Sequence, residues 1–151
     1  MNITFRSYEE KDFNDLKEMI FALYAEDPEG EPMTEAKIKA TVNESIVHPE
    51  KVKLIMIYAD GKIVIGYGII VMFWSNEYGG NIVNIDELYV KEAYRNKQIA
   101  TSFIKHQKTA YPNSVALQLE ATPSNGTAMR LYNRLGFELS ANSHLMLVLT
   151  K

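Results

Sequence analysis

Two cations stand where a predicted strand gives way to a predicted helix, and they could bind a phosphorylated ligand. Residues 86–102 read DELYVKEAYRNKQIATS, which places Arg95 and Lys97 at this junction. The first N–H groups of a helix have no partners within the helix, and the helix dipole adds positive charge at the same end. The junction therefore predicts an anion site. A solvated turn with ordinary surface cations explains the same residues.

The composition indicates one globular domain and excludes several kinds of chemistry. The chain has 151 residues, 46% of them hydrophobic, and a net charge of −3. This length predicts a single domain over residues 1–151, and the mild negative charge disfavours nucleic acid as a partner. Cysteine is absent, so thiolate catalysis, disulfides and cysteine-based zinc sites are excluded. His48, His106 and His144 are far apart in the sequence, so no metal is expected.

The N-terminal residues and the longest apolar run predict neither secretion nor a membrane span. The chain begins MNITFR, without a basic segment that leads into a long apolar run. The longest apolar stretch, residues 63–74, contains two glycines and is too short to cross a bilayer. We therefore expect a cytoplasmic protein with no membrane partner.

Apolar periodicity predicts a strand, two helices and three antiparallel strands in the first half of the chain. The first strand is expected at residues 2–6, and a capping box of Ser7 and Glu10 should start a helix that ends near residue 25. The second helix should run from Thr34 to just before Pro49. Asp60-Gly61 lies between two apolar runs and predicts a hairpin. The three strands are expected at residues 52–59, 63–74 and 82–90.

The second half alternates helices and strands. A helix is expected at about residues 97–111, a strand at 115–119 and a helix at about 125–135, which Gly136 should end. A strand, a helix and another strand in succession imply a right-handed crossover and a parallel pair. Final strands are expected at about residues 137–139 and 144–149.

Two local signatures and the order of the elements resemble one known family. The first signature is Leu88-Tyr89-Val90 followed by Tyr94-Arg95-Asn96-Lys97-Gln98-Ile99-Ala100, and the second is Leu119-Glu120 followed by Asn125-x-x-Ala128-x-x-Leu131-Tyr132-x-x-x-Gly136-Phe137. Both are similar to motifs of the GNAT superfamily of N-acetyltransferases, whose acetyl-CoA loop reads Arg/Gln-x-x-Gly-x-Gly/Ala. The resemblance implies an α/β (α+β) fold, with a mixed, mostly antiparallel central sheet of about seven strands and about four helices on both faces.

The resemblance also implies that the co-substrate is acetyl-CoA and which residues bind it. These residues are Leu88, Tyr89, Val90, Arg95, Asn96, Lys97, Gln98, Ile99, Ala100, Thr101, Asn125 and Tyr132. Backbone groups of Leu88 and Val90 should pair with the pantetheine arm, residues 95–101 should surround the pyrophosphate, and Asn125 should bond to the pantetheine or the phosphate arm. Gln98 departs from the usual glycine: its side chain could obstruct a close approach of the backbone, or its amide could donate to a phosphate oxygen.

Four side chains are candidates for proton transfer. By resemblance, Tyr132 should lie near the thioester sulfur and return a proton to the thiolate. Alternatively, Tyr132 is a core residue on the apolar face of its helix. Glu87, Asp86 and Glu120 are candidate bases, and ordered water is a further one. Asp86 and Glu87 are adjacent on a strand, so their side chains should point to opposite faces and cannot share a proton. Each carboxylate is also explained as a solvated acid at a strand end.

The function implied is direct transfer of an acetyl group from acetyl-CoA to a primary amine. The acidic run within residues 26–31 hints at a small cationic acceptor, such as a polyamine, an aminoglycoside or a lysine-like amine, although a solvated loop explains it too. Trp74 and Tyr78 are candidates to line the acceptor site or to pack at a sheet edge. The alternatives are a non-catalytic acyl-CoA-binding module and an acetyltransferase acting on a protein N-terminus or lysine. Family analogy also allows a homodimer.

Overall fold

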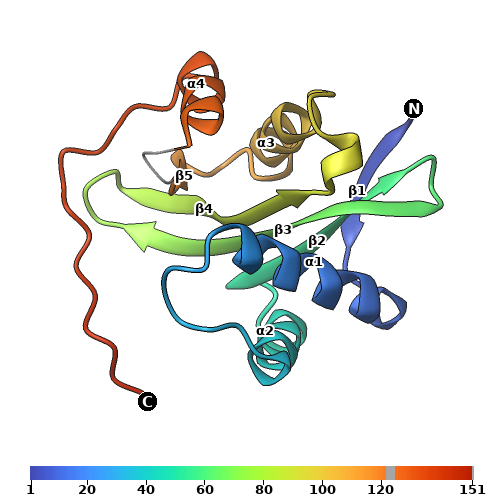
Figure 1. Cartoon of the computed structure of the whole chain (residues 1–151). Coiled ribbons are helices and arrows are strands. Elements are labelled where there is room, and N and C mark those ends of the chain that lie inside the picture. The colour runs from blue at the N-terminus through green and yellow to red at the C-terminus, as the bar shows by residue number, and fades with distance from the viewer. Residues whose placement is uncertain (122–124, 151) are drawn as a thin grey trace. The chain divides into compact units, whose positions relative to one another are not determined.

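The computed structural model describes residues 1–121 and 125–150, which fall into two compact units (Figure 1). The first unit, Met1–Glu120, contains the sheet and three α-helices, and the second, Ala121–Lys151, contains one more. Residues 122–124 and Lys151, which the predicted domain includes, lie outside the described residues. That residues 1–151 form a single domain stays a prediction.

The first unit is built on a five-stranded sheet in which the strands follow one another in chain order. The strands are β1 (Ile3–Ser7), β2 (Val52–Ala59), β3 (Ile63–Ser75), β4 (Gly80–Val90) and β5 (Ala116–Leu119). The first four pair antiparallel, and β4 pairs parallel with β5. The antiparallel run from β2 to β4 and the parallel pair were predicted. The hairpin at Asp60-Gly61 is confirmed: both residues have positive φ, 53° and 66°, which this turn requires.

The four predicted α-helices are confirmed, and their ends agree with the prediction within two residues except at the start of the first helix. They are α1 (Phe13–Glu26), α2 (Glu35–Val47), α3 (Ile99–Ala110) and α4 (Gly126–Arg134), with short 3₁₀ turns η1 (Glu10–Asp12) and η2 (Glu92–Tyr94). The Thr34 hydroxyl accepts from the Lys37 amide at 3.2 Å and caps α2. Gly136, with a φ of 95°, follows α4 in the left-handed conformation expected there.

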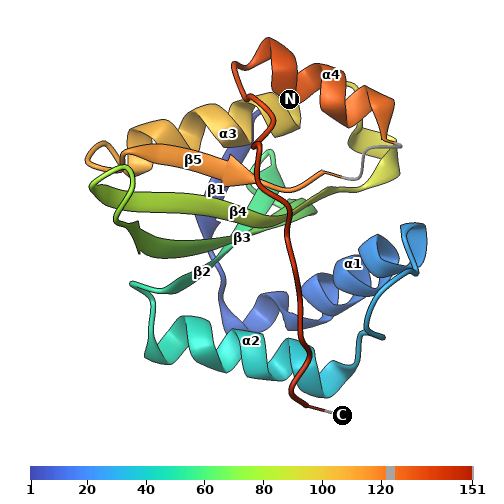
Figure 2. The ribbon, with the colours of Figure 1, turned by 90° about the vertical axis from the view of Figure 1, so that its left-hand side faces the viewer.

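Within the first unit, helices cover both faces of the sheet (Figure 2). On one face, Leu16, Met19 and Ile20 of α1 and Ile38 of α2 pack with alternate residues of the strands, among them Tyr67 and Ile69 of β3. On the other face lies α3, whose Phe103 and Ile104 are fully buried. Alternate residues of β3 thus serve two separate cores, because side chains alternate between the faces of a strand.

The contact between α3 and β3 depends on a missing side chain. A Cβ atom at Gly68 would lie 2.3 Å from Cζ of Phe103, closer than any real contact allows. The Phe103 ring therefore occupies the space that a side chain on β3 would fill. Phe5 of β1 meets the same ring edge-on, with 5.6 Å between centroids.

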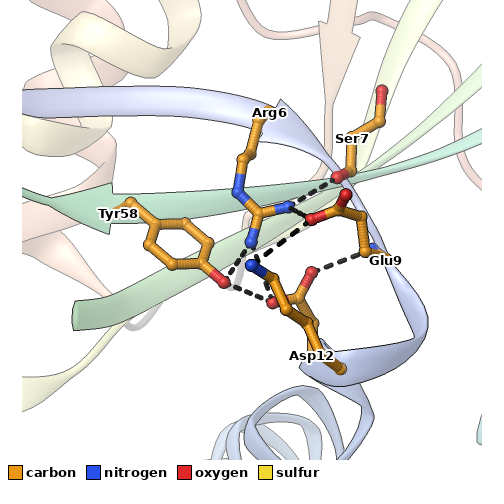
Figure 3. Close-up of polar contacts among 6 residues, drawn as sticks. Arg6, Ser7, Glu9, Asp12 and Tyr58 are labelled. Atoms are coloured by element: carbon orange, nitrogen blue, oxygen red, sulfur yellow. Dashed lines mark hydrogen bonds and ion pairs between the residues drawn. The ribbon is translucent and has the colours of Figure 1, made fainter. Parts of the chain in front are cut away.

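A buried polar cluster joins β1, β2 and the start of α1 (Figure 3). Asp12 is 1% exposed; its Oδ1 accepts from Arg6 Nη2 at 3.1 Å and also from the Tyr58 hydroxyl. The Arg6 guanidinium lies 4.1 Å from the Tyr58 ring centroid. Burial raises the pKa of Tyr58 to about 12, so its hydroxyl keeps its proton and donates at neutral pH.

This cluster also corrects the predicted start of the first helix. The capping box of Ser7 and Glu10 is wrong, because Asp12 Oδ2 accepts from the Glu9 amide at 2.9 Å. Capping therefore occurs two residues later than expected. The serine and glutamate have the right spacing, but the partly buried Arg6 and the buried Tyr58 fix Asp12 in place.

The two strands predicted after α4 are not formed. Residues 137–150 carry no strand in the part of the chain that the structure describes, so the sheet has five strands and not about seven. A strand needs a neighbouring backbone with available N–H and C=O groups, and an apolar run in the sequence carries no information on whether such a neighbour exists.

Among the described residues, no helix is both long enough and apolar enough to cross a membrane.

Candidate active site

The strand β4 continues beyond the end of its pairing with β5. The parallel ladder joins Ile82–Ile85 to Ala116–Leu119, whereas β4 runs on to Val90. Over residues 86–90, the edge of β4 away from β3 therefore has no strand partner among the described residues. This is the stretch that contains Leu88 and Val90, whose backbone groups are predicted to pair with pantetheine. An open strand edge offers the N–H and C=O groups that such pairing needs.

A β-bulge lies at the point where β4 leaves β5. Ile69 of β3 pairs with Glu87, and the next residue, Ile70, pairs with Ile85, so Asp86 is the extra residue. Bulges bend a strand and redirect its side chains, and they are frequent beside functional sites. The bulge therefore sets the directions of the two adjacent carboxylates, Asp86 and Glu87.

Two tyrosine hydroxyls hold the carboxylate of Glu87. Tyr24 of α1 donates to Oε2 at 2.6 Å, and Tyr67 of β3 donates to Oε1 at 2.7 Å. Burial raises the pKa of Glu87, and the charge of Asp86 also raises it, while the two hydrogen bonds act in the opposite direction. The group is thus a carboxylate in a fixed position whose proton affinity lies above that of an ordinary glutamate, as a general base requires.

The other two candidate bases have different neighbours. Burial raises the pKa of Asp86, and the negative charge of Glu120, just after β5, raises it further. No tyrosine donor to Asp86 is seen in the described residues. The structure therefore separates Glu87, which faces α1 and β3, from Asp86 and Glu120, which interact with each other.

The turn into α3 contains two residues in the left-handed backbone region. Asn96 has a φ of 63°, and Gln98, the residue before the first turn of α3, has a φ of 61°. Glycine adopts this region without strain, which explains why glycine is usual in the motif that this loop resembles. Within the described residues, the Gln98 side chain does not cap α3. The first amides of α3 therefore remain without a capping side chain from this residue.

Replacing Gln98 with glycine should stabilise the protein by about 1 kcal/mol, because a left-handed conformation is strained for glutamine. For a chain of this length the melting temperature should rise by roughly 2–4 °C. Thermal unfolding followed by circular dichroism measures it. Asn96→Gly is the matched control, with a smaller gain because asparagine tolerates positive φ. An unchanged or lower melting temperature for Gln98→Gly would contradict the strain.

Arg95 is held between α1 and β4. Its Nη2 pairs with Glu26 Oε1 at 2.6 Å, its Nε donates to the Val90 carbonyl at 2.7 Å, and its guanidinium carbon lies 5.3 Å from the Tyr89 ring centroid. The side chain is thus fixed at the open end of β4, where the pyrophosphate is predicted to bind. An incoming phosphate group would have to share Arg95 with Glu26 or displace it.

A cavity of ≈ 460 Å³ lies at the connection between α1 and α2. Its lining includes Leu23, Tyr24, Asp27, Glu29, Glu31 and Met33. Lys37 also lines it, with its ammonium donating to the Pro32 carbonyl at 2.7 Å. Three carboxylates against one ammonium give the cavity an excess of negative charge. Most of the acidic run thus lines a hollow in the surface instead of lying on a flat loop.

Trp74 and Tyr78 do not reach this region. Trp74 pairs with Asn81 near the far end of β4, five residues before Asp86. At about 3.3 Å per residue that separates them by roughly 16 Å along the strand. Trp74 and Tyr78 are 66% and 62% exposed. That they line the acceptor site stays a prediction, and their place at the opposite end of the strand from Asp86 favours the alternative of packing at the sheet edge.

The second unit contains the two remaining predicted site residues. Oδ1 of Asn125 accepts from the Ala128 amide at 3.2 Å and caps α4. The Tyr132 ring lies 6.0 Å from the Phe137 ring, and burial raises the pKa of its phenol. The roles of Asn125 and Tyr132 toward a ligand on β4 stay predictions. The residues that the structure describes contain no group of three or more histidines or carboxylates arranged to hold a metal ion.

The family described as Acetyltransferase (GNAT) family matches residues 14–137 of the sequence. The chain belongs to the GNAT acetyltransferase family. No curated protein sequence matches the chain.

Solved structures share the GNAT fold over nearly the whole chain. A possible acetyltransferase from Clostridium difficile 630 is 22% identical, with a TM-score of 0.81, and the match covers 99% of this chain and 100% of that one. A ribosomal-protein-alanine N-acetyltransferase from Brucella melitensis biovar Abortus 2308 is 15% identical, with a TM-score of 0.77 and coverage of 98% and 100%. The aminoglycoside acetyltransferase meta-AAC0020 from an uncultured soil metagenomic sample, solved in complex with sisomicin, is 12% identical, with a TM-score of 0.73 and coverage of 98% and 97%.

Two residues beside the candidate base of this GNAT chain were missed by sequence reasoning. Tyr24 is 63 residues from Glu87 in the sequence, and Tyr67 is 20 residues away. Both lie among apolar residues and give no local signal of a carboxylate partner. The available hint is general: a tyrosine within an apolar stripe needs a hydrogen-bond partner for its hydroxyl.

Proposed function

We propose that this chain is an acetyl-CoA-dependent N-acetyltransferase that acts on the primary amine of a small cationic molecule by direct transfer. The observation that carries the proposal is that one strand joins the two halves of the chemistry. β4 leads from Glu87, a held carboxylate, into the turn before α3, where Arg95 and the first helical amides lie.

The residues of β4 and α3 fit acetyl-CoA, which supplies an activated acetyl thioester when bound. The open edge at Leu88 and Val90 offers backbone groups to pantetheine. Arg95, Lys97 and the first turn of α3 offer positive charge and N–H donors to the pyrophosphate. Gln98 keeps the left-handed backbone that a glycine would give, which supports binding despite the departure from the family pattern.

The cavity between α1 and α2 supports a cationic acceptor. The excess of negative charge that Asp27, Glu29 and Glu31 give the cavity favours a positively charged molecule. The fold does not distinguish a protein acceptor from a small-molecule acceptor, because its neighbours include an enzyme named for a ribosomal protein and one named for aminoglycosides. The local charge of this chain is what favours the small molecule.

Glu87 and Tyr132 provide the two proton transfers that amide formation needs. Glu87 takes a proton from the acceptor nitrogen, since burial raises its pKa and so increases its affinity for that proton. Tyr132 gives a proton to the departing sulfur, and burial keeps its phenol protonated. Cysteine is absent from the chain, so the acetyl group passes directly to the amine with no acetyl-cysteine stage.

Thiol release from acetyl-CoA should depend on the presence of a cationic amine. We expect turnover with spermidine, an aminoglycoside or lysine, and a KM for the amine that rises with salt as the acidic cavity is screened. The assay compares these amines with peptides that carry a free N-terminus or a lysine. Turnover with peptides alone would favour a protein acceptor. Calorimetric binding of acetyl-CoA without release for any amine would favour a non-catalytic module.

A further inference from the structure

Tyr24 connects the acidic cavity to the candidate base. It belongs to the lining of the cavity, and its hydroxyl donates to Glu87 Oε2 at 2.6 Å. Glu87 itself is not part of that lining. An amine held by Asp27, Glu29 and Glu31 would therefore meet the Tyr24 side chain before it met the carboxylate.

Tyr67 provides an internal comparison. It donates to the other oxygen of the same carboxylate at 2.7 Å, but it is fully buried and does not line the cavity. The two tyrosines thus do the same for the charge of Glu87 and differ in access to a ligand.

We propose that Tyr24 is a catalytic proton relay that carries a proton from the acceptor amine in the cavity to Glu87. The assignment rests on the proposed acetyltransferase function and adds a residue to its mechanism. Tyr24 Oη accepts a proton from the acceptor nitrogen while its own hydroxyl proton moves to Glu87 Oε2. The relay is concerted, so no free tyrosinate forms, in keeping with the strongly raised pKa of Tyr24.

The protons balance over the whole reaction. An ammonium acceptor loses its first proton through Tyr24 to Glu87, which later releases it to solvent. The neutral nitrogen then forms a bond to the acetyl carbon, the carbon–sulfur bond breaks with its electron pair on sulfur, and Tyr132 protonates the thiolate. The nitrogen loses its second proton to solvent, and Tyr132 recovers one from solvent. One proton is released for each acetyl group transferred.

The groups that face Glu87 determine how the relay depends on pH. Tyr24 faces it from α1, Tyr67 faces it from β3, and the charge of Asp86 acts on it along β4. Glu120 in turn acts on Asp86. Removing either tyrosine hydroxyl takes a donor from the ionised carboxylate and raises its pKa. The acidic limb of the rate profile should therefore move to higher pH in both Tyr24→Phe and Tyr67→Phe.

The plateau of the profile above that limb separates the relay from a structural role. Tyr24→Phe should lower the plateau of kcat on the order of 10²-fold, with a smaller change in the KM of spermidine. Tyr67→Phe should lower the plateau of kcat by a factor at least ten times smaller, because this substitution removes a similar hydrogen bond but no proton path. A solvent deuterium isotope effect on kcat should be present in the wild type and smaller in Tyr24→Phe.

A second measurement works without acetyl-CoA. Carbon-13 NMR titration of the Glu87 carboxyl in both variants should show upward pKa shifts of similar size, and circular dichroism should show that both are folded. Equal plateaus in Tyr24→Phe and Tyr67→Phe, or a wild-type plateau in Tyr24→Phe, would overturn the relay and leave the proposed function standing. A wild type without turnover for any amine would overturn the proposed function and the relay with it.

Discussion

Replacing Tyr132 with phenylalanine should lower kcat on the order of 10³-fold and change the dissociation constant of acetyl-CoA far less. The phenol is proposed to return a proton to the departing thiolate, and a benzene ring has no proton to give. The phenylalanine ring can still pack edge-on against Phe137, as the tyrosine ring does at 6.0 Å. Turnover by thiol release and calorimetric titration of acetyl-CoA measure the two quantities.

The pH dependence of the same variant gives a second check. Because burial raises the pKa of Tyr132, wild-type kcat should fall only above the ordinary tyrosine value of about 10, as the phenol loses its proton. Tyr132→Phe should lack this basic limb. Tyr111→Phe is the matched control, since burial also raises the pKa of Tyr111, which follows the last residue of α3. If Tyr132→Phe retained wild-type turnover, Tyr132 would be a packing residue only.

Replacing Asp12 with alanine should lower the free energy of unfolding by about 3 kcal/mol. The carboxylate is 1% exposed and accepts from Arg6, Tyr58 and the Glu9 amide. Its removal takes the acceptor from the buried Tyr58 hydroxyl and leaves the partly buried Arg6 guanidinium with Glu9, which is exposed, as its carboxylate partner; this costs more than the pair contributed. The value is at the low end for broken buried pairs because Arg6 is 30% exposed. Chemical denaturation measures it.

The melting temperature of Asp12→Ala should be lower than that of the wild type by roughly 6–12 °C, for a chain of this length. Glu9→Ala is the control within the same cluster. Glu9 is 59% exposed and pairs with the same arginine, and exposed pairs contribute less than about 1 kcal/mol. Equal losses in the two variants would show that the buried carboxylate contributes no more than the exposed one.

The sequence correctly predicted the elements whose ends or turns are determined by local residues. The hairpin at Asp60-Gly61, the start of α2 at Thr34 and the end of α4 at Gly136 all follow from local backbone chemistry. The parallel pairing of β4 with β5 follows from the helix between them. The strands expected at residues 137–139 and 144–149 failed because strand formation depends on a partner, and periodicity does not report one.

The candidate site likewise contains features that could be predicted from the sequence and features that could not. The loop at residues 95–101 could be found from its spacing, and the left-handed φ of Gln98 accounts for the glycine of the family pattern. The hydroxyls that hold Glu87 could not be found, because Tyr24 and Tyr67 meet it only after α1 packs on the sheet. Motif spacing reports local backbone geometry, whereas these partners depend on tertiary packing.

The absent side chain at Gly68 has a consequence for how cofactor affinity varies among relatives. Phe103 fills that space and lies one turn beyond Ile99, where α3 begins. A bulkier residue on β3 would push this ring outward and would carry the helix end proposed to bind pyrophosphate away from β4. Two relatives with identical phosphate loops would then differ in their affinity for acetyl-CoA because of one residue on a strand that does not contact the ligand.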